Sequence, residues 1–215
     1  MRDTRLGQAP VKTESGFSLL ELVIVVAVAM IVMAVAVPLI GNATKQYRLT
    51  EAGTDYANLL QQARMRAIQD DKYYTVLTAQ DSTTGWYYAY IDLQGSGSYS
   101  SPDPMITFAQ GVVPQTFSSG PALSNLESQF LPSGAYAQGT VATTATGPTF
   151  GPRGLPCVAQ TSGGYTTCTS LNSPTSFITF IQSDMTTIWE AITVTPASRI
   201  REWSCWDSTT WNARN

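Results

Sequence analysis

One carboxylate stands inside the longest apolar run of this chain. Glu21 follows the sequence Gly16-Phe17-Ser18-Leu19-Leu20 and precedes the unbroken apolar stretch 22–37. An ionised side chain at the centre of a bilayer costs about 2.5 kcal/mol or more. A chain that keeps this charge is expected to have a partner for it, and the polar leader that ends at Gly16 suggests a subunit that is cut, held in a membrane and packed against copies or relatives of itself. The predicted chemistry is proteolytic processing followed by charge-paired assembly.

The segment that contains this carboxylate is long enough to cross a membrane. Residues 17–40 supply the roughly 20 apolar positions that a spanning helix needs. Three positive residues precede it, Arg2, Arg5 and Lys12. Because positive residues stay cytoplasmic, we expect the C-terminal part on the opposite side. A secretory signal peptide cut near Ala34-Val35-Ala36 and a simple signal anchor are the alternatives. The long polar leader and the internal charge disfavour both.

The composition argues against several classes of function. The 215 residues include no histidine, which removes the commonest general base and most zinc sites. The formal net charge of -3 is not that of a basic nucleic-acid-binding chain. No Gly-x-x-x-x-Gly-Lys loop is present, so the chain is not an ATPase of that class. We expect a protein that is not an enzyme and that carries no cofactor and no metal.

Three cysteines, Cys157, Cys168 and Cys205, lie in the C-terminal part. We place this part outside the cytoplasm, where disulfides persist. Cys157 with Cys168 is the preferred pair because it closes a short loop. The other two pairings stay open, since connectivity cannot be deduced from sequence alone.

The periodicity changes along the chain and predicts an α+β fold. Apolar residues recur at intervals of three and four between Leu49 and Ala67, which indicates one face of an amphipathic helix. This helix should run from Phe17 to about Gln69, with a kink or melted turn at Pro38 and Gly41. The expected organisation is a leader (1–16), a transmembrane helix (17–40), its amphipathic continuation (41–70) and a β-rich head (71–215).

Short β-branched and aromatic runs separated by turn residues follow the helix. They predict a long N-terminal helix packed on an antiparallel sheet. The expected strands lie near residues 73–78, 86–91, 105–108, 139–144, 177–181, 188–194 and 198–203.

The stretch Gly16-Phe17-Ser18-Leu19-Leu20-Glu21 resembles the type III prepilin signal of type IV pilins and type II secretion pseudopilins. In that family a prepilin peptidase cuts after the glycine and methylates the new N-terminal phenylalanine. The resemblance implies these processing roles for Gly16 and Phe17. It also implies assembly roles for Glu21, the fifth residue of the mature chain, and for Pro38, which ends the first stretch of the helix. It covers about the first quarter of the chain.

Two later motifs resemble the GspH/FimT-type minor pilins. One is the turn Phe150-Gly151-Pro152-Arg153-Gly154. The other is the strand 188–194 followed by Ser198-Arg199-Ile200-Arg201, in which Ser198 stands where that group has glycine. The resemblance implies a structural subunit near the tip of a type II secretion pseudopilus or a type IV pilus. The subunit would be a single-pass inner-membrane protein with a periplasmic head before it enters the filament.

The partners implied by this resemblance are other pilin or pseudopilin subunits, the prepilin peptidase, the inner-membrane assembly platform and secreted cargo. DNA is a partner only in the alternative interpretation, a FimT-like pilin for DNA uptake. Arg199 and Arg201 fall at alternate positions of a predicted strand, so two guanidinium groups on one side could grip phosphates. A solvated strand edge is the simpler interpretation of the same two residues.

Three further features have a structural and a functional interpretation. Trp203, Trp206 and Trp211 form either core or an exposed partner surface. The loop 92–103 offers oxygen ligands for calcium, but without a liganding spacing, so a plain surface loop is favoured. The pair Asp70-Asp71 is expected to form the C-terminal turn of the helix rather than a catalytic pair of carboxylates.

Overall fold

The computed structural model describes most of the chain after the leader. The described residues are 18–115, 121, 126, 140–141, 146–162, 165–168, 175–183, 187–207 and 209–214. The chain divides into two compact units, residues 1–42 and 43–215, and each is described by itself.

Helix α1 spans Leu19–Asp70, close to the predicted bounds. It runs through Pro38 and Gly41 without a non-helical residue, so the melted turn expected there is not present. The helix ends in a Schellman-type turn, in which Asp71 adopts φ 53° and the backbone N–H of Lys72 donates to the carbonyl of Ala67 at 3.2 Å. The expected C-terminal turn at Asp70-Asp71 is therefore observed.

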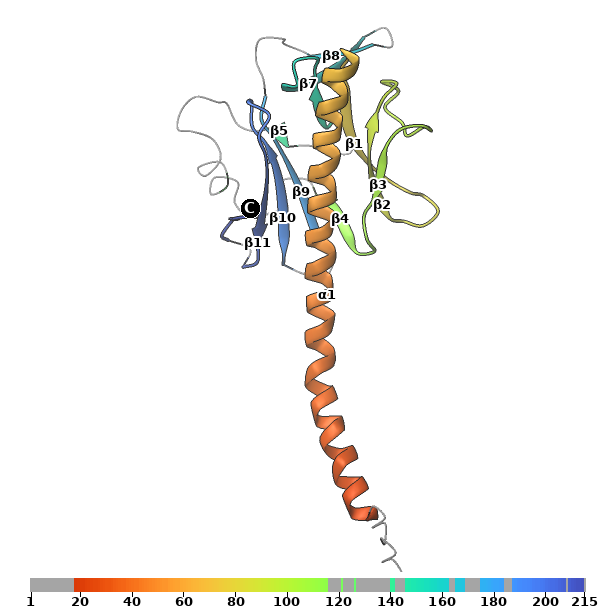
Figure 1. The fold of residues 1–215 in the computed structure, drawn as a ribbon, viewed down its shortest axis with the longest axis vertical. Helices are drawn as coiled ribbons and strands as arrows, with labels where there is room; N and C mark the ends of the chain where they lie inside the picture. The colour runs from red at the N-terminus through yellow and green to blue at the C-terminus, as the bar shows by residue number, and fades with distance from the viewer. Residues whose placement is uncertain are drawn as a thin grey trace, which may run out of the picture. The chain divides into compact units, whose positions relative to one another are not determined.

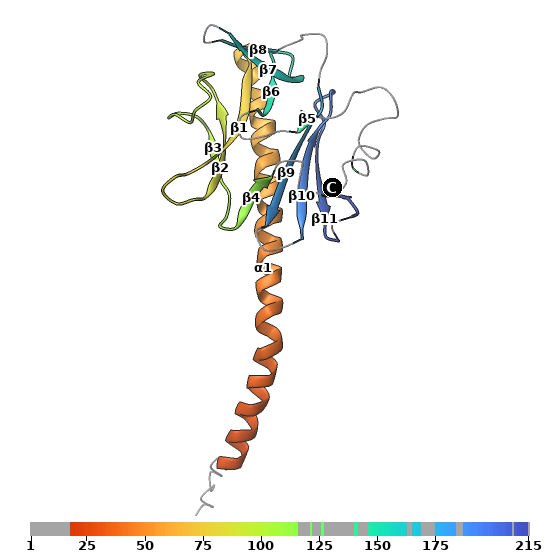
Figure 2. The same cartoon turned by 180° about the vertical axis from the view of Figure 1, so that it is seen from behind.

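Two sheets follow the helix (Figures 1 and 2). The first has the strand order β3-β2-β1-β6-β7-β8 and the second the order β12-β11-β10-β9-β4. The strands of the first sheet are β1 Tyr74–Gln80, β2 Tyr87–Asp92, β3 Met105–Thr107, β6 Pro148–Phe150, β7 Pro156–Ser162 and β8 Tyr165–Cys168. Those of the second are β4 Val112–Gln115, β9 Phe177–Ser183, β10 Trp189–Val194, β11 Ile200–Cys205 and β12 Asn212–Arg214.

The predicted α+β class with antiparallel sheets is confirmed, with two differences in detail. The strands form two sheets instead of one. The segment expected at 139–144 contains β5, Thr140–Val141, which pairs parallel with β9. The rest of that segment, residue 139 and residues 142–144, lies outside the described residues. Strands β4, β6, β7, β8 and β12 were not predicted, because they are short or lie in turn-rich sequence.

The core of the head lies where the helix meets both sheets. One face of α1 supplies Leu49, Tyr56 and Leu60, each at most 1% exposed. Both sheets contribute to the same cluster, in which Val76, Ala89, Ile91, Phe150, Phe177, Ile181, Ile192 and Val194 are buried. In Figures 1 and 2 this part of the helix runs between β1–β3 on one side and β9–β11 on the other. The amphipathic face predicted from the sequence is the face that both sheets cover.

The opposite face of the second sheet has its own apolar layer. Phe180, Trp189, Trp203 and Trp211 pack there with Leu126. Ring centroids of Phe180 and Trp211 lie 5.7 Å apart. This second layer makes β9–β11 a sheet that is buried on both faces.

A glycine lets the helix approach the second sheet closely. A Cβ atom built on Gly53 would collide with Oε2 of Glu190, a residue of β10 that is only 2% exposed. In contrast, a Cβ on Gly41, also inside α1, would meet nothing within 4 Å. Gly53 is thus required by packing, since glycine in a helix interior otherwise lowers stability.

We expect Gly53→Ala to lower the free energy of unfolding by about 1–3 kcal/mol, the usual cost of overpacking. The matched control is Gly41→Ala, which should be neutral or slightly stabilising because alanine favours the helix by up to about 1 kcal/mol. Chemical denaturation of the full-length protein in detergent measures both. Equal effects of the two substitutions would contradict the close packing at Gly53.

Candidate assembly and binding sites

The first unit presents an apolar helix with one acid. Glu21 lies in the first turn of α1 and is exposed. An 18-residue window of α1 has a mean hydropathy of 3.1 and none of it is buried. By length and composition this helix can cross a membrane. Gly16 and Phe17, the predicted cleavage and methylation positions, lie outside the described residues. For Pro38 the structure describes only the helical backbone.

The predicted turn after Phe150 joins two strands of the first sheet. The backbone N–H of Gly154 donates to the carbonyl of Gly151 at 2.7 Å, which closes the turn between β6 and β7. Gly154 has φ +69°, and a Cβ there would lie 2.7 Å from Cδ1 of Ile68 on α1. Position 154 therefore favours glycine for two reasons: its backbone is left-handed, and the helix lies too close to leave room for a side chain.

Ser198 links this turn to the second sheet. Its hydroxyl donates to the carbonyl of Gly154, and Nη1 of Arg64 donates to the carbonyl of Ser198 at 3.3 Å. Ser198 is 1% exposed and adopts φ 63°, a left-handed conformation that favours glycine. The two motifs that resemble minor pilins, far apart in sequence, thus meet beside the end of α1.

The two candidate DNA-binding arginines differ in their surroundings. Arg201 lies in β11, and its guanidinium carbon stands 5.9 Å from the ring centroid of Trp203. Arg199 is exposed and lies one residue before the strand begins, at the end of the turn that includes Ser198. Arg201 therefore lies in the predicted strand. Arg199 does not, because the strand begins one residue after it.

Cys157 and Cys168 form a disulfide that joins β7 to β8. This is the pair preferred from the sequence. Cys205 is a free, buried thiol whose Sγ lies 3.6 Å from Oδ1 of Asp207. Burial raises the pKa of the Cys205 thiol, so it stays protonated and unreactive at neutral pH.

The acids of the loop 92–103 bind backbone N–H groups. Asp92 is 4% exposed and accepts from the backbone N–H of Ser96 at 3.0 Å and of Gly97 at 2.7 Å. Asp103 is 5% exposed and accepts from the backbone N–H of Ser100 at 3.0 Å. Within the described part of the chain, no group of three or more His, Cys, Asp or Glu residues is placed to hold a metal ion. The carboxylates of Asp92 and Asp103 therefore stabilise the loop through hydrogen bonds from its own backbone.

The three C-terminal tryptophans do not form one patch. Trp203 and Trp211 are each 1% exposed and belong to the second apolar layer. Trp206 is 51% exposed. The core interpretation is correct for two of them, and only Trp206 is available to a partner.

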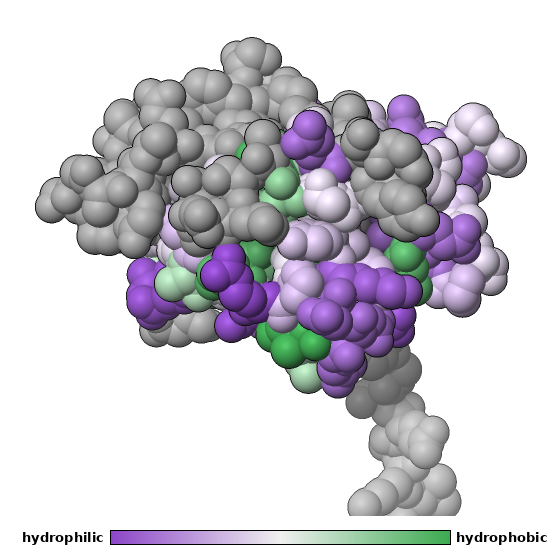
Figure 3. Space-filling view, turned by 90° about the horizontal axis from the view of Figure 1, so that it is seen from above, coloured by the Kyte–Doolittle hydropathy of each residue, from purple (hydrophilic) through white to green (hydrophobic). Residues whose placement is uncertain are grey.

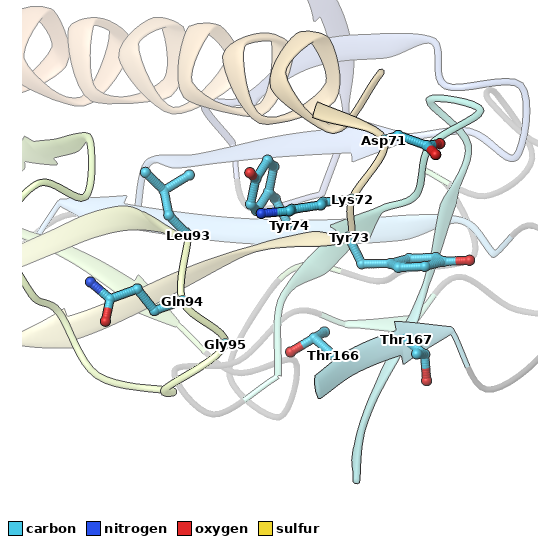
Figure 4. Close-up of a pocket in the computed structure, with 9 residues that line it drawn as sticks. All are labelled: Asp71, Lys72, Tyr73, Tyr74, Leu93, Gln94, Gly95, Thr166 and Thr167. Carbon is cyan, nitrogen blue, oxygen red and sulfur yellow. The ribbon is translucent and has the colours of Figure 1, made fainter. Parts of the chain in front are cut away.

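An open pocket of about 600 Å³ lies at the start of β1. Figure 4 shows that its side chains come from three segments: Asp71 to Tyr74, Leu93 to Gly95, and Thr166 with Thr167 on β8. Gly95 is held close to β8, since a Cβ there would lie 2.8 Å from Oγ1 of Thr166. The lining mixes one ammonium, one carboxylate and several hydroxyls without a nucleophile paired to a base.

A buried acid network joins helix α1 to the C-terminal strand. Oε1 of Glu190 accepts from Thr50 at 2.9 Å and from Nη1 of Arg214 at 2.7 Å. Glu202 accepts from Thr54 at 3.0 Å and lies 3.6 Å from the same Arg214 nitrogen. Oε2 of Glu190 is buried and has no hydrogen-bond partner among the described residues. Burial raises the pKa of Glu190 to about 7, although Arg214 and Thr50 lower it.

Sequence reasoning missed this network, although a signal was present. In β10, Glu190 has the same parity as Ile192 and Val194, both buried against the helix. An acid at an inward position of an apolar strand indicates a buried partner.

Viewed from above, the head surface formed by described residues is mostly hydrophilic, and its apolar areas are small and separate (Figure 3). On this side the head shows no broad apolar interface within the described part of the chain.

Comparison with known families supports the assignment of the N-terminal segment. Residues 11–37 match the family model described as "Prokaryotic N-terminal methylation motif". No curated protein and no solved structure matches the chain. The matched segment includes the predicted cleavage site and Glu21, and it is a type IV pilin-like prepilin signal. With the apolar helix behind it, this signal supports membrane anchoring and suggests a type IV pilin-like structural protein. A signal of this kind implies processing by a prepilin peptidase and assembly with other pilins.

We expect the buried acid to make the stability of the head pH-dependent. The pKa of Glu190 is about 7 in the folded protein and its ordinary value is 4.5. The folded state therefore holds a proton between these values that the unfolded chain has released, and stability falls as pH rises from about 4.5 to 7. Glutamine has no proton to release, so Glu190→Gln should remove about 2–3 kcal/mol of this pH-dependent loss in the free energy of unfolding. At pH 8 the variant should therefore be more stable than the wild type.

Denaturant unfolding of the full-length protein in detergent at pH 4.5, 6 and 8 tests this, using the difference from wild type. Glu51→Gln, an exposed position on α1, is the matched control and should keep the wild-type slope. A Glu190→Gln variant that retains the full pH dependence would show that another group is responsible.

Proposed function

We propose that the chain is a minor pilin or pseudopilin, a non-enzymatic subunit of a type II secretion pseudopilus or a type IV pilus. The observation that carries this proposal is the exposed Glu21 at the start of an apolar helix, inside the matched methylation motif. A peptidase that cuts after Gly16 would supply the ammonium group of Phe17 as its partner. The pair would then fix the register between neighbouring helices, which apolar packing in lipid specifies poorly.

The head supports the minor-subunit part of the proposal. The Gly151–Gly154 turn and the Ser198 turn contact each other and the end of α1, so both motifs that resemble the GspH/FimT group belong to one structural junction. Left-handed Ser198 occupies the position that glycine holds in that group. We place the subunit at or near the filament tip, where its head contacts other minor subunits or secreted cargo.

The positive leader sets the proposed topology. Arg2, Arg5 and Lys12 precede the apolar helix, which favours a cytoplasmic N terminus and a periplasmic head. The disulfide between Cys157 and Cys168 suits an oxidising compartment. From the inner membrane the assembly platform would move the processed subunit into the filament.

DNA uptake is the second candidate function. It is favoured by Arg199, which is exposed at the start of β11, two residues from Arg201. The guanidinium carbon of Arg201 stands 5.9 Å from the ring centroid of Trp203, a cation–π contact that leaves its positive charge in place for a phosphate. The net charge of -3 makes any such contact local.

We expect protein from the native host to begin at Phe17 with one added methyl group, as measured by mass spectrometry. Glu21→Ala should keep this mature N terminus and its membrane insertion, but lose incorporation into filaments, because the ammonium of the neighbouring subunit has no partner. Glu51→Ala, on the same helix but beyond the apolar run, is the control and should incorporate normally. Copurification of Glu21→Ala with filaments at the wild-type level would contradict the charge-pair role. A mature chain that begins after Ala36 would contradict the whole proposal.

If DNA uptake is the function, the full-length protein in detergent should bind duplex DNA in a salt-dependent manner. Arg199→Ala/Arg201→Ala should then weaken binding and lower the slope of log K against log salt concentration by about two, one unit for each lost phosphate contact. Fluorescence anisotropy with labelled duplex at several salt concentrations measures this. Arg48→Ala, which removes a charge from α1, controls for net charge. No binding at low salt would exclude this second function.

A further inference from the structure

An aromatic recess lies on the outer face of the first sheet. Strand β2 places Ala89 and Ile91 in the core, so Tyr88 and Tyr90 face the other way. An open recess of about 320 Å³ lies on this outer face at the β1–β2–β3 end of the sheet. Its lining consists of Gln80, Asp81, Ser82, Thr84, Trp86, Tyr88, Tyr99, Met105 and Thr107.

Three large side chains that line this recess, two of them aromatic, are exposed. Trp86 is 44% exposed, Tyr99 41% and Met105 47%. None of them is needed to cover the core, which is closed by Phe108 and Ile91 on the helix side. Exposed aromatic groups gathered in a concave site are typical of ligand binding.

The recess is preorganised around Tyr99. This ring packs edge-on against Tyr88 and Tyr90, with centroids 5.9 and 5.8 Å apart and interplanar angles of 74° and 78°. The hydroxyl of Tyr90 donates to the carbonyl of Gly97 at 3.1 Å, which ties β2 to the loop that carries Tyr99. Such edge-to-face contacts hold an aromatic ring in one orientation.

Two buried acids hold the loop that carries Tyr99. Asp92 binds the backbone N–H groups of Ser96 and Gly97 on one side of Tyr99, and Asp103 binds that of Ser100 on the other. Burying two carboxylates is costly unless each is fully hydrogen-bonded. A loop fastened in this way on both sides of an exposed ring fixes the position of that ring.

The charge of the lining limits the ligand. Asp81 is the one charged side chain among the residues that line the recess, and no lysine or arginine is among them. Its carboxylate already accepts from the N–H of Thr83 and the hydroxyl of Thr84, both at 2.8 Å. Phosphates and other anions therefore have no counter-ion here. The other polar groups are one amide, one indole N–H and five hydroxyls, which suit a neutral ligand with many hydroxyl groups.

We propose that this recess binds a neutral carbohydrate chain through its pyranose rings. A pyranose has apolar C–H faces that stack on aromatic rings and an edge of hydroxyls that hydrogen-bond to amides, hydroxyls and carboxylates. Trp86 and Tyr99 supply the stacking surfaces. Asp81, Gln80 and Thr107 supply acceptors and donors at the rim. The proposal concerns the head alone and does not depend on the assembly role of Glu21.

Isothermal titration of the full-length protein tests the proposal, in a polyoxyethylene detergent because a sugar headgroup would compete. The probes are cellopentaose and maltopentaose, for neutral glucans, and a pentamer of N-acetylglucosamine, for acetylated glycans. We expect at least one to bind with Kd near 1 mM or tighter. Trp86→Ala and Tyr99→Ala should each weaken that binding by about tenfold. Tyr99→Phe, which keeps the ring, should bind close to wild type.

Trp206→Ala is the matched control, since Trp206 is exposed but does not line the recess, and it should leave binding unchanged. Thermal unfolding verifies that each variant is folded. The proposal is overturned if no oligosaccharide binds, or if Trp86→Ala and Tyr99→Ala bind as well as wild type. It is also overturned if choline or a proline decapeptide binds in a Trp86-dependent manner and the sugars do not, or if Trp86 proves to be required only for association with a second copy of the chain.

Discussion

The head depends on the burial of one helix face between two sheets. Leu49, Tyr56 and Leu60 contact strands from both sheets within a single apolar cluster. On the face toward the helix, neither sheet forms a core by itself. Buried apolar residues of β1, β2, β9 and β10 belong instead to one cluster with those of α1. The spacing of the sheets is then set by how close the helix can come. At Gly53 the backbone itself is the contact surface for Glu190.

Two acids of this chain, Glu190 and Glu21, lie among apolar residues, and they differ in whether the chain itself supplies a cationic partner. Glu190 has its cation within the chain, since Arg214 reaches it from the last described strand. That arrangement makes the C-terminal strand part of the mechanism that holds the helix on the sheet. Glu21 has no such partner within the described part of the chain. A charge in an apolar helix is costly without a partner, and for this reason we propose that Glu21 pairs with another molecule, whereas Glu190 is paired within the head.

The sequence predicted what depends on local pattern. The helix from about residue 19 to 70 follows from an apolar run and a three-four periodicity, and β9 and β10 follow from short runs rich in β-branched and aromatic residues. The division into two sheets was not predictable in this way, because it depends on which strands pair across long distances. Strand β6 pairs with β1, which lies more than 70 residues earlier in the sequence. The local sequence of its three residues does not predict this pairing. The fastening role of Asp92 and Asp103 was hidden for the same reason, since their carboxylates point back at the backbone of their own loop.

The leader and the head are subject to different physical constraints. The N-terminal segment must suit a peptidase, a bilayer and neighbouring helices at once, so a short stretch fixes its class. The head must only cover the helix face, which leaves its outer surfaces open to other uses. On the outer face of β1–β3, aromatic side chains are held in place by contacts with a hydrogen-bonded loop and are not part of the helix–sheet core. Because the rings at Trp86 and Tyr99 contribute nothing to the helix–sheet core, their position is best explained by contact with a ligand. The ligand binding that we propose for this chain therefore lies on the outer face of the head, and the filament contact that we propose lies in the N-terminal helix.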